Sequence, residues 1–436
     1  MLLVIVACLM LAIDQANGQV TAPPVAYLQV PVQRQLDWHR MEYYAFIHFG
    51  PNTFTDEEWG RSQQTPDIFN PTALDTDQWA KSFADAGMSG MILTAKHHDG
   101  MALWNTSTTN YKIANGGWAK NRTAAGLQAD VVRMAATSAQ KYNLKFGVYL
   151  SPWDIHRDPA MPKPLLNGTI YDEPQIFGDD TAGDYNDLYR RQLTELVNIT
   201  LEDGSPASVF EIWLDGASGS STLQTFDWAG FRDIIRTHQP AAVMWGHQGW
   251  TLDGRTQDQD RLSEIDLQTG LRDGLYWTPA EADARVRSGW FWHANEQPKT
   301  EQQLLDMYLQ SVGRSVSLLL DVPPDTTGQI TQEDINVLME FKERTGWVEI
   351  DLGGPALVDA FVVQEHIALG QRVGGYAIDC IVDGAFKTVV NGTSLGYKRI
   401  DRLETAVETS RVRFQVTQAN AVPLIQSMQV LGTRTL

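Results

Sequence analysis

An acidic side chain stands at the end of an apolar run, where it could act as a nucleophile or a general base. In "VFEIWLDGASG" (209–219), the apolar run ends at Asp215 and a turn of small residues follows. An aspartate in such a place often caps a turn or a helix. Gly216 and Ala217 leave the approach to the carboxylate open, however, and a cap would not need that clearance. The pattern therefore favours a chemical role for Asp215.

Polar side chains also follow other apolar runs in the first half of the chain. His48 lies in "IHFG", His97 and His98 lie in "AKHHDG", and Tyr149 and Trp153 lie in "KFGVYLSPWD". A single histidine such as His48 is often structural. Neighbouring residues on a strand point to opposite faces, so packing alone explains the histidine pair poorly. Polar groups that converge from several strand ends are what an active site requires.

The residue types disfavour a metal at these positions. The chain has two cysteines, Cys8 and Cys380, and no helix with an HExxH pattern. We expect neither a metal ion nor another cofactor.

Short apolar runs alternate with amphipathic stretches from residue 43 onward. Strands are expected at 43–50, 88–100, 145–152, in the run before Asp215, at 241–246 and at 315–324, with a further apolar run at 288–293. Helices are expected at 74–87, 129–143, 185–200, 227–240 and 300–315. This α/β alternation predicts an irregular (β/α)8-type barrel, in which catalytic groups lie at the carboxyl ends of the strands.

An open doubly wound sheet is the alternative architecture. It is weakened because "FGPN" (49–52) follows the first strand where a Gly-rich phosphate-binding turn would be expected. The Pro- and Asp-rich segment 154–182 is typical of a long loop over one face of the barrel.

The composition and the periodicity of the sequence change after the helix expected at 331–346. Short β-branched runs punctuated by glycine predict a C-terminal antiparallel β-sandwich. We therefore divide the chain into a signal peptide (1–18), a catalytic barrel (19–346) and a β-sandwich domain (347–436).

The first residues are typical of a secretory signal. The apolar run 2–13 is too short to span a bilayer, and the small residues around 16–18 offer a cleavage site. Five N-glycosylation sequons occur, at Asn105, Asn121, Asn167, Asn198 and Asn391. We expect an N-glycosylated protein that is secreted or held in the lumen of the secretory or lysosomal system, without a membrane partner.

Charge and aromatic content narrow the class of substrate. The formal net charge of −19 repels phosphate backbones and sulfated glycans, so nucleic acid is not an expected partner and neutral substrates fit best. Fourteen tryptophans suit a sugar-binding surface, because indoles stack on sugar rings, although a large core would also use them.

Five ordered motifs resemble one enzyme family. "YYAFIHFGPNTFTDEEWG" (43–60), "ILTAKHHDGMALWNTSTTNY" (92–111), "KFGVYLSPWD" (145–154), "FEIWLDGA" (210–217) and "LLLDVPPDTTG" (318–328) are similar to segments of the alpha-L-fucosidases, glycoside hydrolase family 29. The resemblance covers 36–345 and continues in "GQRVGGY" and "GTSLGYKRI". It implies an irregular barrel followed by a β-sandwich. It also implies hydrolysis of terminal alpha-L-fucose, with retention of configuration, from a fucosylated oligosaccharide or glycoprotein.

The resemblance also implies roles for single residues. Asp215 matches the nucleophile of the family. His48, His97 and His98 match positions that hydrogen-bond fucose hydroxyls, and Trp59 matches an aromatic position of the fucose site. The other binding residues that we expect are Glu58, Tyr149, Trp153 and Trp290. Trp59 or Trp290 would cover the methyl group of fucose.

A retaining mechanism needs a second carboxyl group roughly 5–5.5 Å from the nucleophile. Our first choice is Glu264, because the preceding Asp253-Gly254-Arg255 resembles the Asp-x-Arg-Trp run before the acid/base of the 1,3/1,4-specific branch. Thr256 replaces the Trp of that run, and Leu262-Ser263 replaces the Gly-Asn before the glutamate. Arg255 would then bind Glu264 or a substrate hydroxyl.

Glu281 is the alternative acid/base, or a residue that shapes the leaving-group subsite. It lies in "YWTPAEADARVRSGWFWH" (276–293), which resembles a stretch of the same branch, with Trp292 in place of a tyrosine. This match favours alpha-1,3/1,4 linkages.

Two other functions stay open on the sequence. One is a fucose-binding, lectin-like protein with a degraded catalytic pair, which the divergence around Glu264 favours and the intact Asp215 disfavours. The other is a retaining barrel glycosidase for a different sugar, which the His-His-Asp strand end at 97–99 disfavours.

Overall fold

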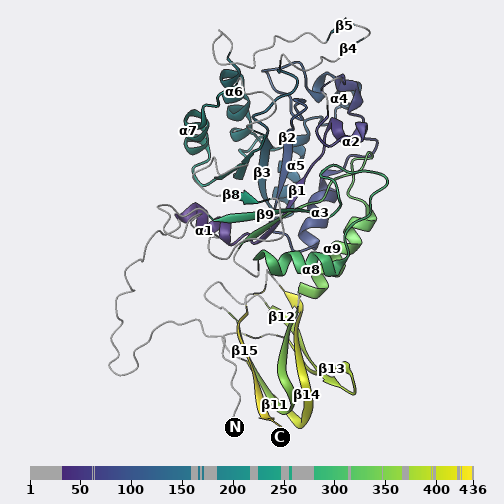
Figure 1. The fold of residues 1–436 in the computed structure, drawn as a ribbon, viewed down its shortest axis with the longest axis vertical. Helices are drawn as coiled ribbons and strands as arrows, with labels where there is room; N and C mark the ends of the chain where they lie inside the picture. The colour runs from purple at the N-terminus through teal and green to yellow at the C-terminus, as the bar shows by residue number, and fades with distance from the viewer. Residues whose placement is uncertain are drawn as a thin grey trace, which may run out of the picture. The chain divides into compact units, whose positions relative to one another are not determined.

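The structure of the chain is a computed structural model. It describes residues 32–60, 62, 64–158, 165–166, 169–170, 184–216, 224–246, 255–257, 279–312, 316–345, 347–365, 373–393, 395, 399–419, 423 and 425–434. The expected signal peptide and most of the loop 154–182 lie outside these residues. The chain forms two compact units, with a boundary between Phe341 and Lys342 (Figure 1). None of the helices in the described part is long and apolar enough to cross a membrane.

Eight parallel strands form the sheet of the first unit, in the order β7-β6-β3-β2-β1-β10-β9-β8. Their bounds are β1 Tyr43–Ile47, β2 Gly90–Lys96, β3 Lys145–Leu150, β6 Val209–Leu214, β7 Val243–Gly246, β8 Arg255–Gln257, β9 Ala280–Arg285 and β10 Ser317–Asp321. The order follows the chain around the sheet, and the end strands β7 and β8 bring Cα atoms within 8 Å of each other. The sheet therefore curls into a (β/α)8-type barrel, which confirms the predicted fold class. A short antiparallel pair, β4 Leu165–Leu166 and β5 Thr169–Ile170, lies apart from it.

Several helices of this unit begin at polar side chains that cap them. The bounds of the helices are α1 Gln33–His39, α2 Pro51–Thr55, α3 Thr76–Asp85, α4 Gly117–Ala124, α5 Val131–Lys141, α6 Tyr185–Val197, α7 Trp228–His238, α8 Glu301–Gln310 and α9 Gln332–Thr345. Asp75 accepts hydrogen bonds from two backbone N–H groups at the start of α3, and Asp130 accepts one at the start of α5. Such caps satisfy N–H groups that have no partner inside the helix.

Strand β9 was not expected from the sequence, because it contains no apolar run. The apolar run 288–293 follows β9 as a series of bends, and β9 itself has the sequence "AEADAR". Ala280, Ala282 and Ala284 pack in the core between sheet and helices, while Glu281 and Asp283 are also buried. Along β9, the alanines therefore face the helices and the carboxyl side chains face the inside of the barrel. Such a sequence does not have the pattern of an apolar strand.

Aromatic side chains fill the inside of the barrel. The inner cluster contains Trp38, Met41, Tyr44, Phe46, Ile92, Tyr149, Trp213, Val243, Trp245 and Leu319. Trp38 of α1 stacks on Trp245 of β7 with ring centroids 4.6 Å apart. The Trp38 indole N–H also donates a hydrogen bond to the hydroxyl of Tyr44, which is near the start of β1. Helix α1 therefore covers the amino ends of the strands. The carboxyl ends of the strands lie at the other end of the barrel.

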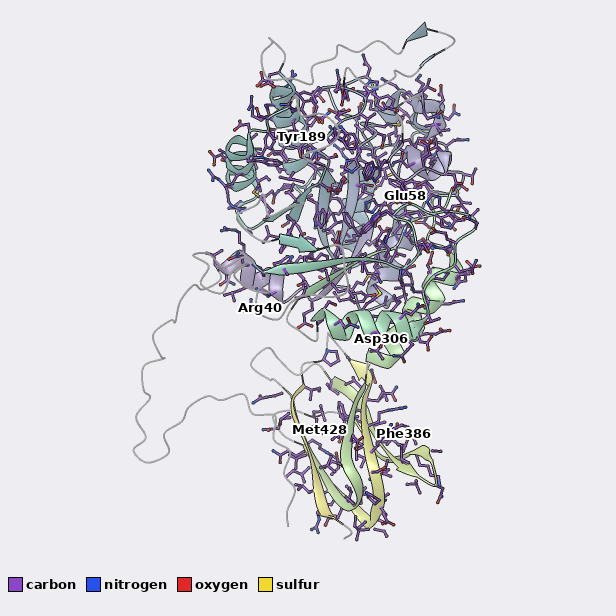
Figure 2. All side chains as sticks on the ribbon, in the orientation of Figure 1. Arg40, Glu58, Tyr189, Asp306, Phe386 and Met428 are labelled. Atoms are coloured by element: carbon purple, nitrogen blue, oxygen red, sulfur yellow. The ribbon has the colours of Figure 1, made fainter. Side chains whose placement is uncertain are left out.

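The C-terminal unit is a five-stranded antiparallel sheet in the order β13-β12-β14-β11-β15. Its strands are β11 Trp347–Glu365, β12 Val373–Val382, β13 Ala385–Gly392, β14 Arg399–Ala419 and β15 Ile425–Arg434. Register shifts between Asp351 and Ala356 and between Val358 and Ala360 bend the two longest strands. Phe361, Ile378 and Phe414 lie in its own hydrophobic core. Figure 2 shows the side chains of both units.

Candidate active site

Asp215 is the first residue after β6, and its carboxylate is held by three neighbours. The Tyr149 hydroxyl donates to Oδ2 at 3.0 Å, the Gly216 backbone N–H donates to Oδ1 at 2.7 Å, and Nε2 of His98 lies 3.5 Å from Oδ2. Hydrogen bonds to an ionised carboxylate fix its orientation. The side chain is 28% exposed, so an incoming ligand can reach it.

Gly216 has a steric reason to be glycine. Its φ of +74° is one that other residues rarely adopt, and a Cβ there would lie 2.3 Å from Cε1 of His98. The small residue therefore lets the histidine approach the carboxylate.

Three histidines form a buried cluster beside Asp215. The ring of His97 lies 4.2 Å from that of His98 and 5.5 Å from that of His48. Burial lowers the pKa of His48 to about 4, and burial with the two neighbouring histidines lowers the pKa of His97 well below its usual value. Both rings are therefore neutral near pH 7, and a neutral imidazole can donate one hydrogen bond and accept another.

Each ring has a fixed orientation. Nδ1 of His98 lies 2.7 Å from Oγ of Ser151, and the His97 ring stacks on Tyr149. Nδ1 of His48 lies 2.7 Å from Oδ1 of Asp321, the last residue of β10. Nε2 is therefore the nitrogen of His48 that is left for a ligand.

Asp321 is a site residue that the sequence analysis missed. It is fully buried, and burial, with Glu58 nearby, raises the pKa of its carboxyl group well above the usual value. The available signal was its position, because it ends an apolar run in "LLLDVPP" as Asp215 ends one in "FEIWLDG".

Aromatic rings border the histidine cluster. Trp59 is 61% exposed and lies edge-on to His98 and Trp153. On the other side, the ring of Trp290 lies 5.2 Å from that of His48. The structure thus gathers all of the expected binding aromatics around the carboxyl ends of β1, β2, β3 and β6.

Glu58 forms hydrogen bonds with the segment that follows β9. Its carboxylate accepts hydrogen bonds from the backbone N–H groups of Trp290 at 3.0 Å and Phe291 at 3.3 Å. Nε2 of His293 lies 2.7 Å from its Oε1. The glutamate therefore joins the segment after α2 to the segment after β9, in addition to its predicted contact with substrate.

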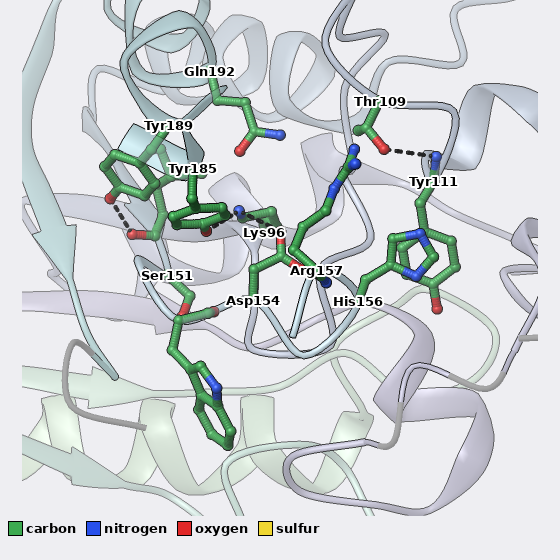
Figure 3. A network of polar contacts seen from close by, with 12 residues as sticks. Lys96, Thr109, Tyr111, Ser151, Asp154, His156, Arg157, Tyr185, Tyr189 and Gln192 are labelled. Carbon is green, nitrogen blue, oxygen red and sulfur yellow. Dashed lines mark hydrogen bonds and ion pairs between the residues drawn. The ribbon is translucent and has the colours of Figure 1, made fainter. Parts of the chain in front are cut away.

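A buried ion pair between Lys96 and Asp154 joins two segments of the site (Figure 3). Lys96, the last residue of β2, donates to Asp154 Oδ2 at 3.0 Å and to the Tyr185 hydroxyl at 3.1 Å. Burial alone would raise the pKa of Asp154, but Lys96 and Arg157 outweigh burial and lower it. Since Lys96 precedes His97 and Asp154 follows Trp153, the pair holds two segments of the site together. Sequence reasoning missed it, although a lysine inside the apolar run of β2 was a visible signal.

Glu281 lies at the opposite end of the barrel from Asp215. It is the second residue of β9, is fully buried, and accepts a hydrogen bond from the Tyr44 hydroxyl beside Glu211. Glu211 precedes Asp215 by four residues, or roughly 13 Å of strand at about 3.3 Å per residue. This corrects the alternative assignment, because Glu281 cannot protonate a leaving group that is bound beside Asp215.

The first choice for the acid/base falls outside the described residues. Glu264 lies in the segment 258–278, which follows β8. The backbone of Arg255 pairs with Ala280, the first residue of β9, so the structure does not place Arg255 beside Asp215. Within the described residues, no group of three or more His, Cys, Asp or Glu side chains could hold a metal ion.

The chain is similar in sequence and in fold to known alpha-L-fucosidases. A sequence model of the family described as "Alpha-L-fucosidase" matches residues 26–350. The putative alpha-L-fucosidase 1 of Oryza sativa subsp. japonica is 34% identical over 473 residues, covering 93% of this chain and 85% of that protein. Alpha-L-fucosidase 1 of Arabidopsis thaliana is 32% identical, covering 95% and 89%. A Ruminococcus gnavus GH29 fucosidase in complex with fucose has a TM-score of 0.65 at 27% identity, covering 96% of this chain and 98% of that one.

Proposed function

The chain belongs to the alpha-L-fucosidase family of glycoside hydrolases, and from that premise we propose that it removes terminal alpha-L-fucose with retention of configuration. The observation that carries the proposal is the position of Asp215. Its carboxylate follows β6 at the end of the barrel where the histidine cluster lies, accepts a hydrogen bond from Tyr149, and stays accessible. That is the placement a nucleophile needs.

The proposed reaction is a double displacement. Asp215 attacks the anomeric carbon while a carboxylic acid gives its proton to the leaving oxygen, and a fucosyl-enzyme ester forms. The same second group then takes a proton from water, which attacks the anomeric carbon and releases fucose and the free carboxylate. We assign this second role to Glu264 by its place in the sequence.

Recognition of the sugar is assigned to the neutral histidines and the aromatic border. Neutral imidazoles at 48 and 97 can donate to some fucose hydroxyls and accept from others. The methyl group of fucose would rest on Trp290 or Trp59, because sugar carbons pack well against indole rings. Glu58, His98, Tyr149 and Trp153 complete the proposed binding site.

The proposed substrates are alpha-1,3/1,4-fucosylated oligosaccharides or glycoproteins. The support is the sequence match at 276–293, together with the position of Trp290 and Phe291 beside the histidine cluster. We propose a secreted or lumenal, N-glycosylated protein, consisting of a barrel (19–346) and a β-sandwich (347–436) after removal of 1–18. Four of the sequon asparagines, Asn105, Asn121, Asn198 and Asn391, are exposed in the described residues, which is compatible with glycosylation.

Trapping of the covalent intermediate tests the proposal directly. A 2-deoxy-2-fluoro-L-fucosyl fluoride should inactivate the enzyme in a time-dependent manner, and the added mass should map to the peptide that contains Asp215. A label on another residue would refute the assignment of the nucleophile. Reversible binding of the reagent without any added mass would favour the lectin-like alternative instead.

A further inference from the structure

One histidine joins two segments at the carboxyl end of the barrel. Nδ1 of His293 lies 2.6 Å from Oδ1 of Asp56, and Nε2 lies 2.7 Å from Oε1 of Glu58. We call these three residues the histidine clasp. Asp56 and Glu58 follow α2, whereas His293 ends the segment 286–293 that follows β9. The clasp is therefore a contact between parts of the chain more than 200 positions apart, as the separations of 237 and 235 residues show.

The two contacts together require a positive charge on the imidazole ring. A neutral imidazole carries one N–H, so it can donate to one carboxylate only. Its other nitrogen would then direct a lone pair at a carboxylate oxygen 2.6–2.7 Å away, which is repulsive. An imidazolium carries two N–H groups and satisfies both partners.

The Glu58 side of the clasp is closely packed, whereas the Asp56 side chain is exposed. A Cβ on Gly289 would lie 2.5 Å from Oε1 of Glu58 and 2.7 Å from Cδ2 of His293. The Gly289 backbone N–H donates to Glu296, and the Arg285 guanidinium lies 4.9 Å from the centroid of the Trp290 ring. The charged and titratable groups around the clasp are thus its two carboxylates, Glu296 and Arg285, and also Asp321 and His48, which interact with Glu58.

The clasp holds aromatic rings against the proposed sugar site. Glu58 accepts hydrogen bonds from the N–H groups of Trp290 and Phe291 with the same carboxylate that contacts His293. The Trp290 ring lies 5.2 Å from that of His48, and the Phe291 ring lies 5.1 Å from that of His97. Loss of the His293 contact would leave this carboxylate held by the two backbone N–H groups alone, and would loosen both rings.

We propose that His293 is a positioning residue that must be charged to hold Trp290 and Phe291 against the fucose site, so that sugar affinity falls when it loses its proton. The inference rests on the proposed function, because it takes the histidine cluster as the place where fucose binds. It assigns to Asp56 and His293 a role that none of the sequence motifs gave them.

The direction of the pH effect follows from the neighbours of His293. Burial lowers its pKa, but the hydrogen bonds to Asp56 and Glu58 outweigh burial and raise it above the usual 6.5. A raised pKa in the folded state means that the contact is fully formed below about pH 6.5 and is lost as the pH rises through the higher folded value. Affinity for a neutral sugar should therefore fall on the alkaline side.

The Asp56→Asn variant separates the charge requirement from the contact itself. An asparagine amide can donate to a bare Nδ1 while a neutral imidazole donates its Nε2–H to Glu58, so this clasp needs no proton. Asp56 is exposed and has a φ of +58°, which asparagine tolerates well, so the fold is not at risk. His293→Gln is the matched loss of the clasp, because the single amide nitrogen of glutamine cannot replace both ring nitrogens.

The measurement is the dissociation constant of L-fucose between pH 5.5 and 9 for the wild type and both variants. We expect the wild-type constant to rise by roughly tenfold across the range, as for the loss of one charge-assisted hydrogen bond. Asp56→Asn should remain nearly flat, and His293→Gln should be weak throughout. Parallel profiles for the wild type and Asp56→Asn would overturn the proposal, even if His293→Gln fails to fold.

Hydrogen–deuterium exchange of the peptide that covers 286–293 gives a readout without sugar. Between pH 6 and 9 the wild-type peptide should lose protection relative to Asp56→Asn, since the two differ only in the need for a proton. If L-fucose binds neither protein, the proposed fucose site is wrong, and the exchange data alone then decide about the clasp. Equal protection in both proteins would refute it.

Discussion

Nδ1 of His48 lies 2.7 Å from Oδ1 of Asp321, and the same oxygen lies 3.3 Å from the backbone N–H of His48. His48 follows β1 and Asp321 ends β10, and the two strands are parallel neighbours. One carboxyl oxygen thus fixes both the ring and the backbone of a histidine that is expected to bind sugar. The histidine can present Nε2 to a ligand only while this partner holds it.

Removal of that partner should weaken sugar binding while the chemistry persists. For Asp321→Ala we expect kcat/KM for an aryl fucoside to fall by at least about tenfold, mainly through KM, because a buried ring nitrogen loses its acceptor. Asp321→Asn keeps an acceptor oxygen and should recover most of the activity. A kcat loss without a KM change, equal in both variants, would contradict a role in orienting His48.

Asp215→Asn should abolish turnover and leave the fold unchanged. The amide cannot form the ester intermediate, so we expect kcat to fall by at least about 10³-fold, with a circular dichroism spectrum like that of the wild type. Added azide should restore part of the activity toward an activated aryl fucoside and give a fucosyl azide of inverted configuration. Rescue that yields a product of retained configuration would show that another residue is the nucleophile.

Much of the site could be predicted because its signals are local. Asp215, His48 and the pair at 97–98 each follow an apolar run, and parallel strands bring their carboxyl ends together. The same logic would have included Asp321, which ends β10. Lys96 and Asp154 form a pair only in the folded chain, and a sequence without spatial contacts cannot join them.

Strand β9 shows where sequence reasoning could not succeed. Its inward positions carry Glu281 and Asp283, so its apolar side consists of alanines only. The similarity at 276–293 suggested a role for this segment, but similarity does not tell which end of a strand faces the ligand. Glu281 lies at the amino end of β9, and its proposed chemical role failed for that reason.

The roles of Glu264 and Glu281 can be separated by matched amide variants. Glu264→Gln should lower kcat/KM for a fucosyl oligosaccharide strongly and spare an aryl fucoside with a good leaving group, because only the poor leaving group needs a proton. Azide should then intercept its fucosyl-enzyme. Glu281→Gln should show neither behaviour, since Glu281 is fully buried at the far end of the barrel. The reverse outcome would mean that the acid/base assignment is wrong.

The two buried glutamates at the amino end of the barrel should make stability depend on pH. Burial, together with the charge of Glu211, raises the pKa of Glu281 well above the usual 4.5, and burial raises the pKa of Glu211 as well. Raised folded pKa values favour the native state at low pH, and this contribution is lost as the pH rises from about 4.5 through the folded values. We therefore expect the midpoint of thermal unfolding to fall between pH 5 and pH 8.

Glu281→Gln should reduce this slope. The amide can accept from the Tyr44 hydroxyl and donate to Glu211 without a proton to lose, so the variant should melt higher than the wild type at pH 8 and about equally at pH 5. Asp306→Asn is the control, because Asp306 is exposed on α8 (Figure 2) and should leave the slope unchanged. Scanning calorimetry at both pH values makes the comparison. A slope that stays the same in Glu281→Gln would mean that the pKa of Glu281 is not raised in the folded barrel.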